Sequence, residues 1–227
     1  MRIILRKIKS CLFYIRDFPK TLYFNFKVLQ FNDAKYLPIR VKWNVKTRKL
    51  FKGTVIIKGE LKKSMIKLGY SGTEFIPYKI SYIYIGREGK LIFNGECKIA
   101  EGFNIYINNG TLELGRNVYV NRNLQIQCEK YIKIGDKSLL GWNLNIRDTD
   151  GHPVVCNGQK RDKTKEIIIG DKVWLASDST VLKGTNISNG SILATNSVIC
   201  GYICEENNCL LAGIPAKVKK KNVEWIE

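Results

Sequence analysis

The sequence predicts an all-β fold: a prism of short parallel strands built from six-residue repeats, with a basic helical segment before it and a short tail after it. Aliphatic residues recur every six positions through much of the second half of the chain, at Ile169, Leu175, Val181, Ile187, Leu193 and Ile199. Most residues four places after each of these are small or β-branched. A helix would repeat its apolar positions about every 3.6 residues and a simple strand every two, so neither produces this period.

A six-residue step fits a short strand followed by a two-residue corner, with the aliphatic side chain pointing inward. Three such sides close one triangular coil of about 18 residues. Ile169 is therefore expected to stack under Ile187, and Leu175 under Leu193. We expect the prism to span residues 52–204 in about seven coils.

Two steps break the period in the middle of the prism. The step from Ile126 to Ile134 is eight residues long, and the step from Ile146 to Ile169 is 23. The longer step places residues 147–168 outside the prism as a loop. The residues of this loop that carry chemistry of interest are Asp148, Asp150 and His152.

The two ends of the chain lack the repeat. Residues 1–51 are predicted to form a basic helical or extended segment, and residues 205–227 a short C-terminal tail. Apolar residues of the first segment share one helical face, at Ile4, Ile8, Leu12 and Ile15. Basic residues lie on another face, at Arg2, Arg6, Lys9, Arg16 and Lys20. Pro19 is expected to limit this helix, because proline lacks a backbone N–H.

The net charge of +18 is concentrated at the N-terminus. Residues 1–67 contain 18 Lys and Arg against three acidic residues, whereas residues 68–227 contain 20 against 17. The longest apolar run has five residues, Cys11–Ile15, too few for a membrane span. No signal-peptide pattern is found, and seven scattered cysteines without a CxxC pair indicate reduced thiols. We therefore expect a cytoplasmic protein.

Several motifs of the second half resemble a known family. The runs IIIGDKVWLASDSTVLKGTNISNGSILATNSVI (167–199) and LLAGIPAKVKK (210–220) resemble the hexapeptide-repeat acyltransferases, which fold as a left-handed parallel β-helix. GRNVYVNRNL (115–124), TDGHPV (149–154) and VWLAS (173–177) are similar in order and spacing to galactoside and maltose acetyltransferases. DFPKTLYFNF (17–26) and LPIRV (37–41) are similar to members that act on bacterial surface polysaccharides.

The resemblance implies an O-acetyltransferase. It would move an acetyl group from acetyl-CoA to a sugar hydroxyl of a capsular or O-antigen polysaccharide or its precursor, directly and without a metal. It also implies a homotrimer whose active sites are shared by neighbouring subunits. A sugar hydroxyl is a weak nucleophile at neutral pH, so a base must take its proton. The resemblance identifies this base as His152, the one histidine of the chain.

Further site residues follow from the same resemblance. Asn121 matches the residue that aligns the acceptor hydroxyl, although an asparagine at a corner also suits a left-handed backbone. Asp148 or Asp150 could orient the imidazole, or both could form a turn. We favour Asp148 for the orienting role and place Asp150 with Trp174 on the substrate side. Trp174 is either a wall of the acceptor site or a packing residue between coils.

The acyl donor has its own set of residues. The backbone N–H of Ser177 would face the thioester oxygen as charge develops there. Small side chains on the prism would leave room for the pantetheine arm of CoA. Lysines near the C-terminus would bind the CoA phosphates, or they could simply form a solvated tail. The cofactor-binding residues implied besides Ser177 are Ala176, Ala194, Thr195, Lys217 and Lys220.

Other functions remain as alternatives. A zinc-dependent carbonic anhydrase of this fold needs three imidazoles, and a nucleotidyltransferase needs a Gly-rich phosphate loop, so both are excluded. A small sugar could be the acceptor, but the acidic N-terminal residue that would hold it has no counterpart here. The chain could instead be a non-catalytic module that binds membranes or polyanions. No recognised nucleic-acid fold is found, whereas residues 1–31 suit the anionic inner face of a membrane.

Overall fold

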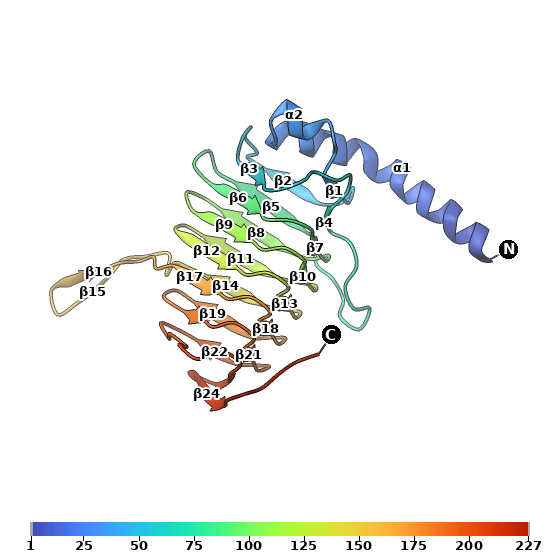
Figure 1. The fold of residues 1–227 in the computed structure, drawn as a ribbon. Helices are drawn as coiled ribbons and strands as arrows, with labels where there is room; N and C mark the ends of the chain where they lie inside the picture. Colours follow the sequence, from blue (N-terminus) through green and yellow to red (C-terminus); the bar gives the residue numbers. More distant parts are fainter. Residues whose placement is uncertain (1, 227) are drawn as a thin grey trace.

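The protein is a three-sided prism of parallel β-strands with a long helix at its N-terminal end (Figure 1). The computed structural model describes the backbone of residues 2–226 and the side chains of residues 15–226. Each coil of the chain passes once along each side of the prism. Successive coils stack with their strands parallel and in register.

The three sides are named sheets A, B and C. Sheet A contains nine strands, in the order β1 (Ile39–Val41), β4 (Ile66–Leu68), β7 (Cys97–Ile99), β10 (Val118–Val120), β13 (Leu139–Leu140), β18 (Trp174–Leu175), β21 (Ile192–Leu193), β23 (Leu210–Gly213) and β24 (Ala216–Lys220). Sheet B contains seven, β2 (Lys46–Arg48), β5 (Tyr82–Ile85), β8 (Asn104–Ile107), β11 (Gln125–Cys128), β14 (Asn145–Arg147), β19 (Thr180–Leu182) and β22 (Val198–Ile199). Sheet C contains six, β3 (Val55–Ile57), β6 (Lys90–Phe93), β9 (Thr111–Leu114), β12 (Tyr131–Ile134), β17 (Ile167–Ile169) and β20 (Asn186–Ile187).

The core of the prism is the aliphatic stack that the six-residue period predicts. Ile169 pairs with Ile187 and Leu175 with Leu193, and all four side chains are fully buried. Complete burial of such a side chain stabilises the fold by about 1.5–3 kcal/mol. The predicted stacking is therefore confirmed.

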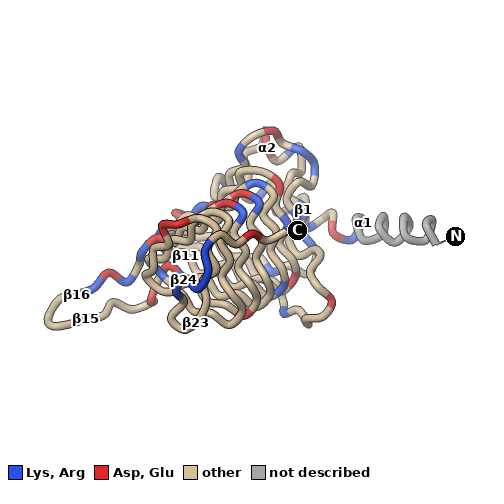
Figure 2. Tube along the Cα trace, turned by 60° about the horizontal axis from the view of Figure 1, so that its bottom comes forward, with Lys and Arg blue, Asp and Glu red and all other residues tan. Residues whose placement is uncertain are grey.

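The chain departs from the prism at two places. Between β14 and β17 it forms a hairpin of β15 (Val154–Cys156) and β16 (Gln159–Arg161), which are antiparallel and project away from the body (Figures 1 and 2). This segment lies where the 23-residue step predicts a loop. A second loop, residues 69–81, joins β4 to β5 and was not predicted.

The parallel strands extend beyond both predicted limits of the prism. β1 and β2 already pair with β4 and β5, so the first coil begins before residue 52. At the other end β23 continues sheet A beside β21, and Leu211 is fully buried in the core beyond residue 204. Much of the basic N-terminal third is therefore part of the prism rather than an appendage.

The N-terminal helices close one end of the prism. α1 (Arg2–Val28) continues through Pro19, so the predicted limit at that residue is wrong, and α2 (Phe31–Ala34) follows it. Contacts with the first coil stabilise the part of α1 that follows Pro19. The Asn25 side chain donates to the carbonyl of Ile39 at 2.6 Å and accepts from the N–H of Ile39 at 3.1 Å. Phe24 and Val28 are fully buried. The side chains of residues 1–14, which include most of the predicted amphipathic faces, lie outside the described residues.

Candidate active site

One group of the predicted site residues lies along one edge of the prism, where each coil turns from sheet A into sheet B; its members are Asn121, Ala176, Ser177, Ala194 and Thr195. We call this the A–B edge and define it by residues 121–123, 141–143, 176–178 and 194–196 on successive coils. Backbone bonds of 2.8 Å join these corners to the next coil, from Asn121 N–H to Leu140, from Gly141 to Leu175, and from Ala176 to Leu193. Residues far apart in sequence are thus placed in one row.

Asn121 begins this row. Its side-chain oxygen accepts two backbone hydrogen bonds, from Thr73 at 3.0 Å and from Arg122 at 2.9 Å. Two donors at one oxygen fix the orientation of the amide, because the NH₂ group cannot accept. The side chain therefore has a defined orientation, which a group that aligns a substrate requires.

Ser177 lies two coils further along the edge and is buried. Its hydroxyl oxygen accepts from the backbone N–H of Trp142 at 3.3 Å. Within the described part of the chain, no acceptor is found for its own backbone N–H. A buried N–H without a partner is rare, and a donor held in this way suits a developing oxyanion. The residue therefore fits the role that the resemblance implies.

The predicted donor residues continue from Ser177 toward the C-terminal end. Ala176 is buried, Ala194 is partly exposed and Thr195 is exposed. Lys217 and Lys220 are exposed on β24, the last strand of sheet A. Small side chains thus line the edge beside Ser177, and exposed lysines lie near the end of the prism.

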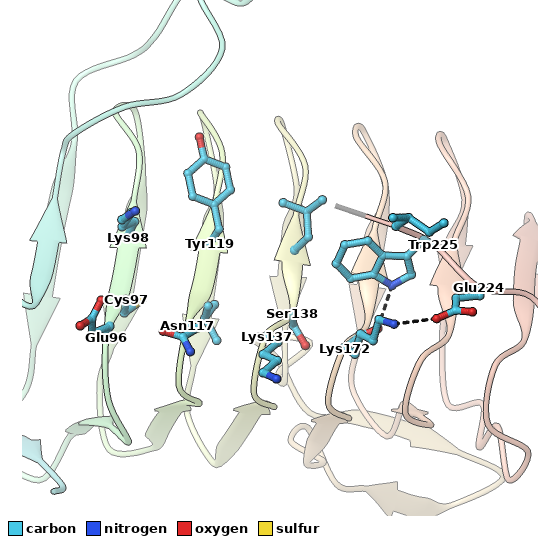
Figure 3. A pocket seen from close by; sticks show the side chains of 13 residues that line it. Glu96, Cys97, Lys98, Asn117, Tyr119, Lys137, Ser138, Lys172, Glu224 and Trp225 are labelled. Atoms are coloured by element: carbon cyan, nitrogen blue, oxygen red, sulfur yellow. Dashed lines mark hydrogen bonds and ion pairs between the residues drawn. The ribbon is translucent and has the colours of Figure 1, made fainter.

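Trp174 lies on the outer face of sheet A rather than on the edge itself. Its ring packs against Trp225 of the C-terminal segment, with centroids 6.3 Å apart. The Trp225 indole donates to the carbonyl of Lys172 at 2.8 Å, and Glu224 pairs with the Lys172 ammonium at 3.0 Å (Figure 3). A groove of about 830 Å³ runs beside them over β7, β10 and β13, lined in part by Lys98, Tyr119 and Lys137. Trp174 therefore contacts the chain's own tail.

His152 lies on the hairpin, away from the A–B edge. The hairpin leaves the prism at the corner between sheets B and C, and Figure 1 shows it projecting to the side opposite α1. The imidazole is exposed, and no hydrogen bond to it is found among residues 15–226. Asp150, also exposed, pairs with Lys183 at 2.6 Å. A single chain therefore does not bring His152 to Asn121 and Ser177.

Asp148 lies at the base of the hairpin and is fully buried. Its carboxylate accepts from the backbone N–H groups of Glu129 at 2.8 Å and Lys130 at 2.7 Å. Burial raises the pKa of this carboxyl, and the two N–H donors oppose the rise. No contact with His152 is found in the described residues, so an orienting role for Asp148 stays a prediction.

The Asp148→Asn variant is expected to unfold more easily, by about 2 kcal/mol, because an amide can accept only one of the two backbone donors. Urea unfolding at neutral pH measures this loss. Asp150→Asn is the matched control, and this exposed change is expected to stay within about 0.5 kcal/mol of wild type. A variant at 148 with unchanged stability and a reduced kcat would instead support the orienting role.

The sequence did not reveal two features of the A–B edge. One is Trp142, which lies between the corners of Asn121 and Ser177. The other is loop 69–81, which folds against that edge. A signal for the loop was present, since Gly69, Gly72 and Pro77 interrupt the strand-like alternation.

Two features are absent from the described residues. No group of three or more His, Cys, Asp and Glu side chains in this part of the chain is arranged to hold a metal ion. Among the described helices, none combines the length and apolar character that crossing a membrane requires.

Comparison with known proteins identifies several O-acetyltransferases as relatives. No family model matched the sequence. The chain is 30% identical over 149 residues to a putative lipopolysaccharide biosynthesis O-acetyl transferase, WbbJ of Escherichia coli K12, covering 61% of this chain and 75% of the relative. It is 29% identical over 160 residues to the polysialic acid O-acetyltransferase of Neisseria meningitidis, covering 63% and 74%. It is 32% identical over 117 residues to the galactoside O-acetyltransferase of E. coli K12, covering 50% and 56%.

Comparison with solved structures also finds an acetyltransferase with this fold. The crystal structure of the polySia-specific acetyltransferase NeuO superposes with a TM-score of 0.60 at 19% identity, covering 83% of this chain and 73% of that one. The predicted left-handed parallel β-helix is confirmed. Acetyltransferases of this family use acetyl-CoA as the acyl donor. The chain belongs to the hexapeptide-repeat O-acetyltransferases and is an acetyl-CoA-dependent enzyme.

Proposed function

We propose that this enzyme acetylates a hydroxyl of a bacterial surface polysaccharide or of its lipid-linked precursor. The observation that carries the proposal is the row of Asn121, the unpaired N–H of Ser177 and the small residues beside it on one edge. This row offers an aligning amide, an oxyanion donor and space for an extended donor. The names of the relatives, which include lipopolysaccharide and polysialic acid enzymes, support a polysaccharide acceptor.

A homotrimer would complete the site. His152 projects from the B–C corner, whereas Asn121 and Ser177 lie on the A–B edge. Neighbouring prisms around a three-fold axis would place the hairpin of one subunit against the A–B edge of the next. Each of the three sites would then take its base from one chain and its oxyanion donor from another.

The reaction at such a site is a direct transfer. The imidazole of His152 takes the proton of the acceptor hydroxyl as its oxygen attacks the thioester carbonyl carbon. The Ser177 N–H stabilises the negative charge that develops on the carbonyl oxygen. The tetrahedral intermediate then collapses, the carbon–sulfur bond breaks, and the CoA thiolate receives the proton from the imidazolium. No group of the protein becomes acetylated.

The donor end of the site fits CoA. Ala176, Ala194 and Thr195 leave the edge beside Ser177 without bulky side chains, and the pantetheine arm needs this space. Lys217 and Lys220 supply fixed positive charge for phosphate groups. Asp150 and Trp174 stay candidates for the acceptor side, with Asp150 paired to Lys183 and Trp174 packed on Trp225.

Surface polysaccharide from cells that carry or lack the gene tests the function directly. The proposal expects one acetyl group more per modified sugar in the material from cells with the gene, detected by mass spectrometry. It also expects the purified enzyme to restore that group on material from the deletion strain with acetyl-CoA. Acetylation of a simple galactoside alone would favour a small acceptor. If no acetyl transfer is detected, the result would favour the alternative that the chain is a non-catalytic binding module.

The N-terminal helix suits the cytoplasmic face of the membrane. One side of α1 is bound to the first coil through Asp17, Asn25 and the buried Phe24. A second stripe with helical spacing leaves large apolar side chains exposed, at Ile15 and Leu22 among others. Residues 1–67 carry a net charge of +15, which attracts anionic lipid. We place the enzyme peripherally on this surface, where it would meet a lipid-linked acceptor.

Vesicle flotation measures this placement. The protein is expected to float with vesicles of phosphatidylglycerol and phosphatidylcholine, and to release at high salt because screening weakens the attraction. Ile15→Glu with Leu22→Glu is expected to abolish flotation. Val155→Glu on the distant hairpin, also an exposed apolar residue, is the matched control. Equal flotation of both variants would refute the placement. It would favour the alternative that the positive charge of residues 1–67 binds an acidic glycan.

A further inference from the structure

Loop 69–81 forms a second wall beside the A–B edge. It leaves sheet A after β4, and three hydrogen bonds to Asn121 and Asn123 hold it to the edge. The N–H of Thr73 donates to Asn121 Oδ1 at 3.0 Å, and the N–H of Lys79 donates to Asn123 Oδ1 at 3.1 Å. Asn123 Nδ2 donates in return to the carbonyl of Pro77 at 3.0 Å. The loop is thus bonded to the residues that flank the predicted acceptor position.

A charged cluster secures the middle of the loop. Arg122 donates to the carbonyl of Ile76 at 2.7 Å and pairs with Glu101 at 3.0 Å, and Glu101 also pairs with Lys42. The ring of Tyr78 lies near both cations, 5.6 Å from the Lys42 ammonium and 5.3 Å from the guanidinium of Arg122. These contacts are mostly buried, so screening by water is weak. The loop therefore has a fixed position.

The fixed loop presents Phe75 next to Trp142. Their ring centroids are 6.0 Å apart at an interplanar angle of 57°. Phe75 is 79% exposed, the most exposed aromatic side chain among the described residues. Together with Trp142, which is partly exposed, it forms a contiguous apolar patch, and such patches are typical of binding sites. The pair is therefore not explained by packing of the core.

Trp142 occupies the corner between those of Asn121 and Ser177. Its N–H donates to Ser177 Oγ at 3.3 Å, and its carbonyl accepts from the N–H of Asp178 at 2.9 Å. Asn121 lies one coil before it. Stacked coils are separated by about 4.8 Å, so a ring resting on Trp142 lies within about one coil of both Asn121 and the Ser177 N–H.

We propose that Phe75 and Trp142 form the platform on which one sugar ring of the acceptor glycan stacks, and that they thereby position its hydroxyl for acetylation. A pyranose has an apolar face of C–H groups and a polar rim of hydroxyls. Its apolar face matches the two rings, and its rim would lie near the NH₂ of Asn121, for which no acceptor is found among residues 15–226. This inference rests on the proposed function and names two specificity-determining residues for it.

Steady-state kinetics with polysaccharide from the deletion strain and acetyl-CoA tests the platform. Phe75→Ala and Trp142→Ala are each expected to raise the KM for the polysaccharide about tenfold, since aromatic stacking is of this size. The KM for acetyl-CoA is expected to stay within about twofold, and Trp142→Phe to restore most of the acceptor affinity. Tyr36→Ala, another exposed aromatic residue, is the matched control outside the site.

The outcomes separate this inference from the function on which it rests. If wild-type enzyme leaves the polysaccharide unacetylated, the proposed function fails and the platform fails with it. If wild type is active and both variants keep its KM for the polysaccharide, only the platform is overturned. Phe75→Ala decides the question even if Trp142→Ala does not fold, because the Phe75 side chain is almost wholly exposed.

Discussion

The His152→Ala enzyme is expected to transfer acetyl groups at less than about one hundredth of the wild-type rate. His152 is the one imidazole of the chain, so the variant loses the proposed general base that takes the proton of the acceptor hydroxyl. The measurement is release of CoA in the presence of acceptor. Binding of CoA, followed by calorimetry, and the trimeric mass in solution are expected to be unchanged, because the imidazole is exposed.

A neighbouring residue of the hairpin provides the control for this variant. Gln159 is exposed like His152 and lies on β16, so Gln159→Ala removes a side chain without touching the base. It is expected to keep wild-type activity. If the His152→Ala enzyme keeps more than a hundredth of the activity, a different group must act as the base.

A single methyl group at Gly141 is expected to lower kcat on the order of tenfold to a hundredfold. A Cβ at this position would lie 2.7 Å from the backbone nitrogen of Ser177 and 3.0 Å from its Cα, so the corner of Ser177 must move. Its N–H would then point away from the thioester oxygen. Overpacking of this kind also costs about 1–3 kcal/mol of stability. Steady-state kinetics at saturating acetyl-CoA, with urea unfolding alongside, measures both effects.

Gly135 offers a matched comparison at another corner of the prism. A Cβ there would lie 2.5 Å from the backbone of Gly170, a clash of the same kind, but between sheets C and A. Gly135→Ala is therefore expected to lose similar stability and to keep kcat close to wild type. Equal loss of kcat in both variants would attribute the effect to the fold rather than to Ser177.

The repeat was predictable because its cause is local. Burying one aliphatic side chain per side, at Ile169, Leu175 and their successors, imposes a period of six that no other regular structure shares. The strands beyond the predicted limits were harder to find, since β2 of the first coil consists of Lys46, Thr47 and Arg48 and buries no aliphatic side chain. The continuation of α1 through Pro19 depends on contacts with that coil, which local propensity does not contain.

The candidate site was predictable only in part. Motif resemblance selected Asn121 and Ser177, and the prism places both on one edge because corners of successive coils stack. Trp142 was missed because a tryptophan at a corner has no repeat signature, and Phe75 because its loop takes its place through Arg122 and Glu101. The distance of His152 from the edge follows from the corner at which its hairpin leaves, which the six-residue period does not specify.

Mixed trimers test the shared site most directly. Co-expression of the His152→Ala chain with the Gly141→Ala chain, each carrying a different affinity tag, gives trimers that contain both after two successive purifications. If each site joins the hairpin of one subunit to the A–B edge of the next, every trimer that contains both chains has one site with an intact hairpin and an intact edge, which is about one third of the sites. The account predicts acetyl transfer well above that of either variant alone. Activity no higher than that of the separate variants would contradict it and place the whole site within one chain.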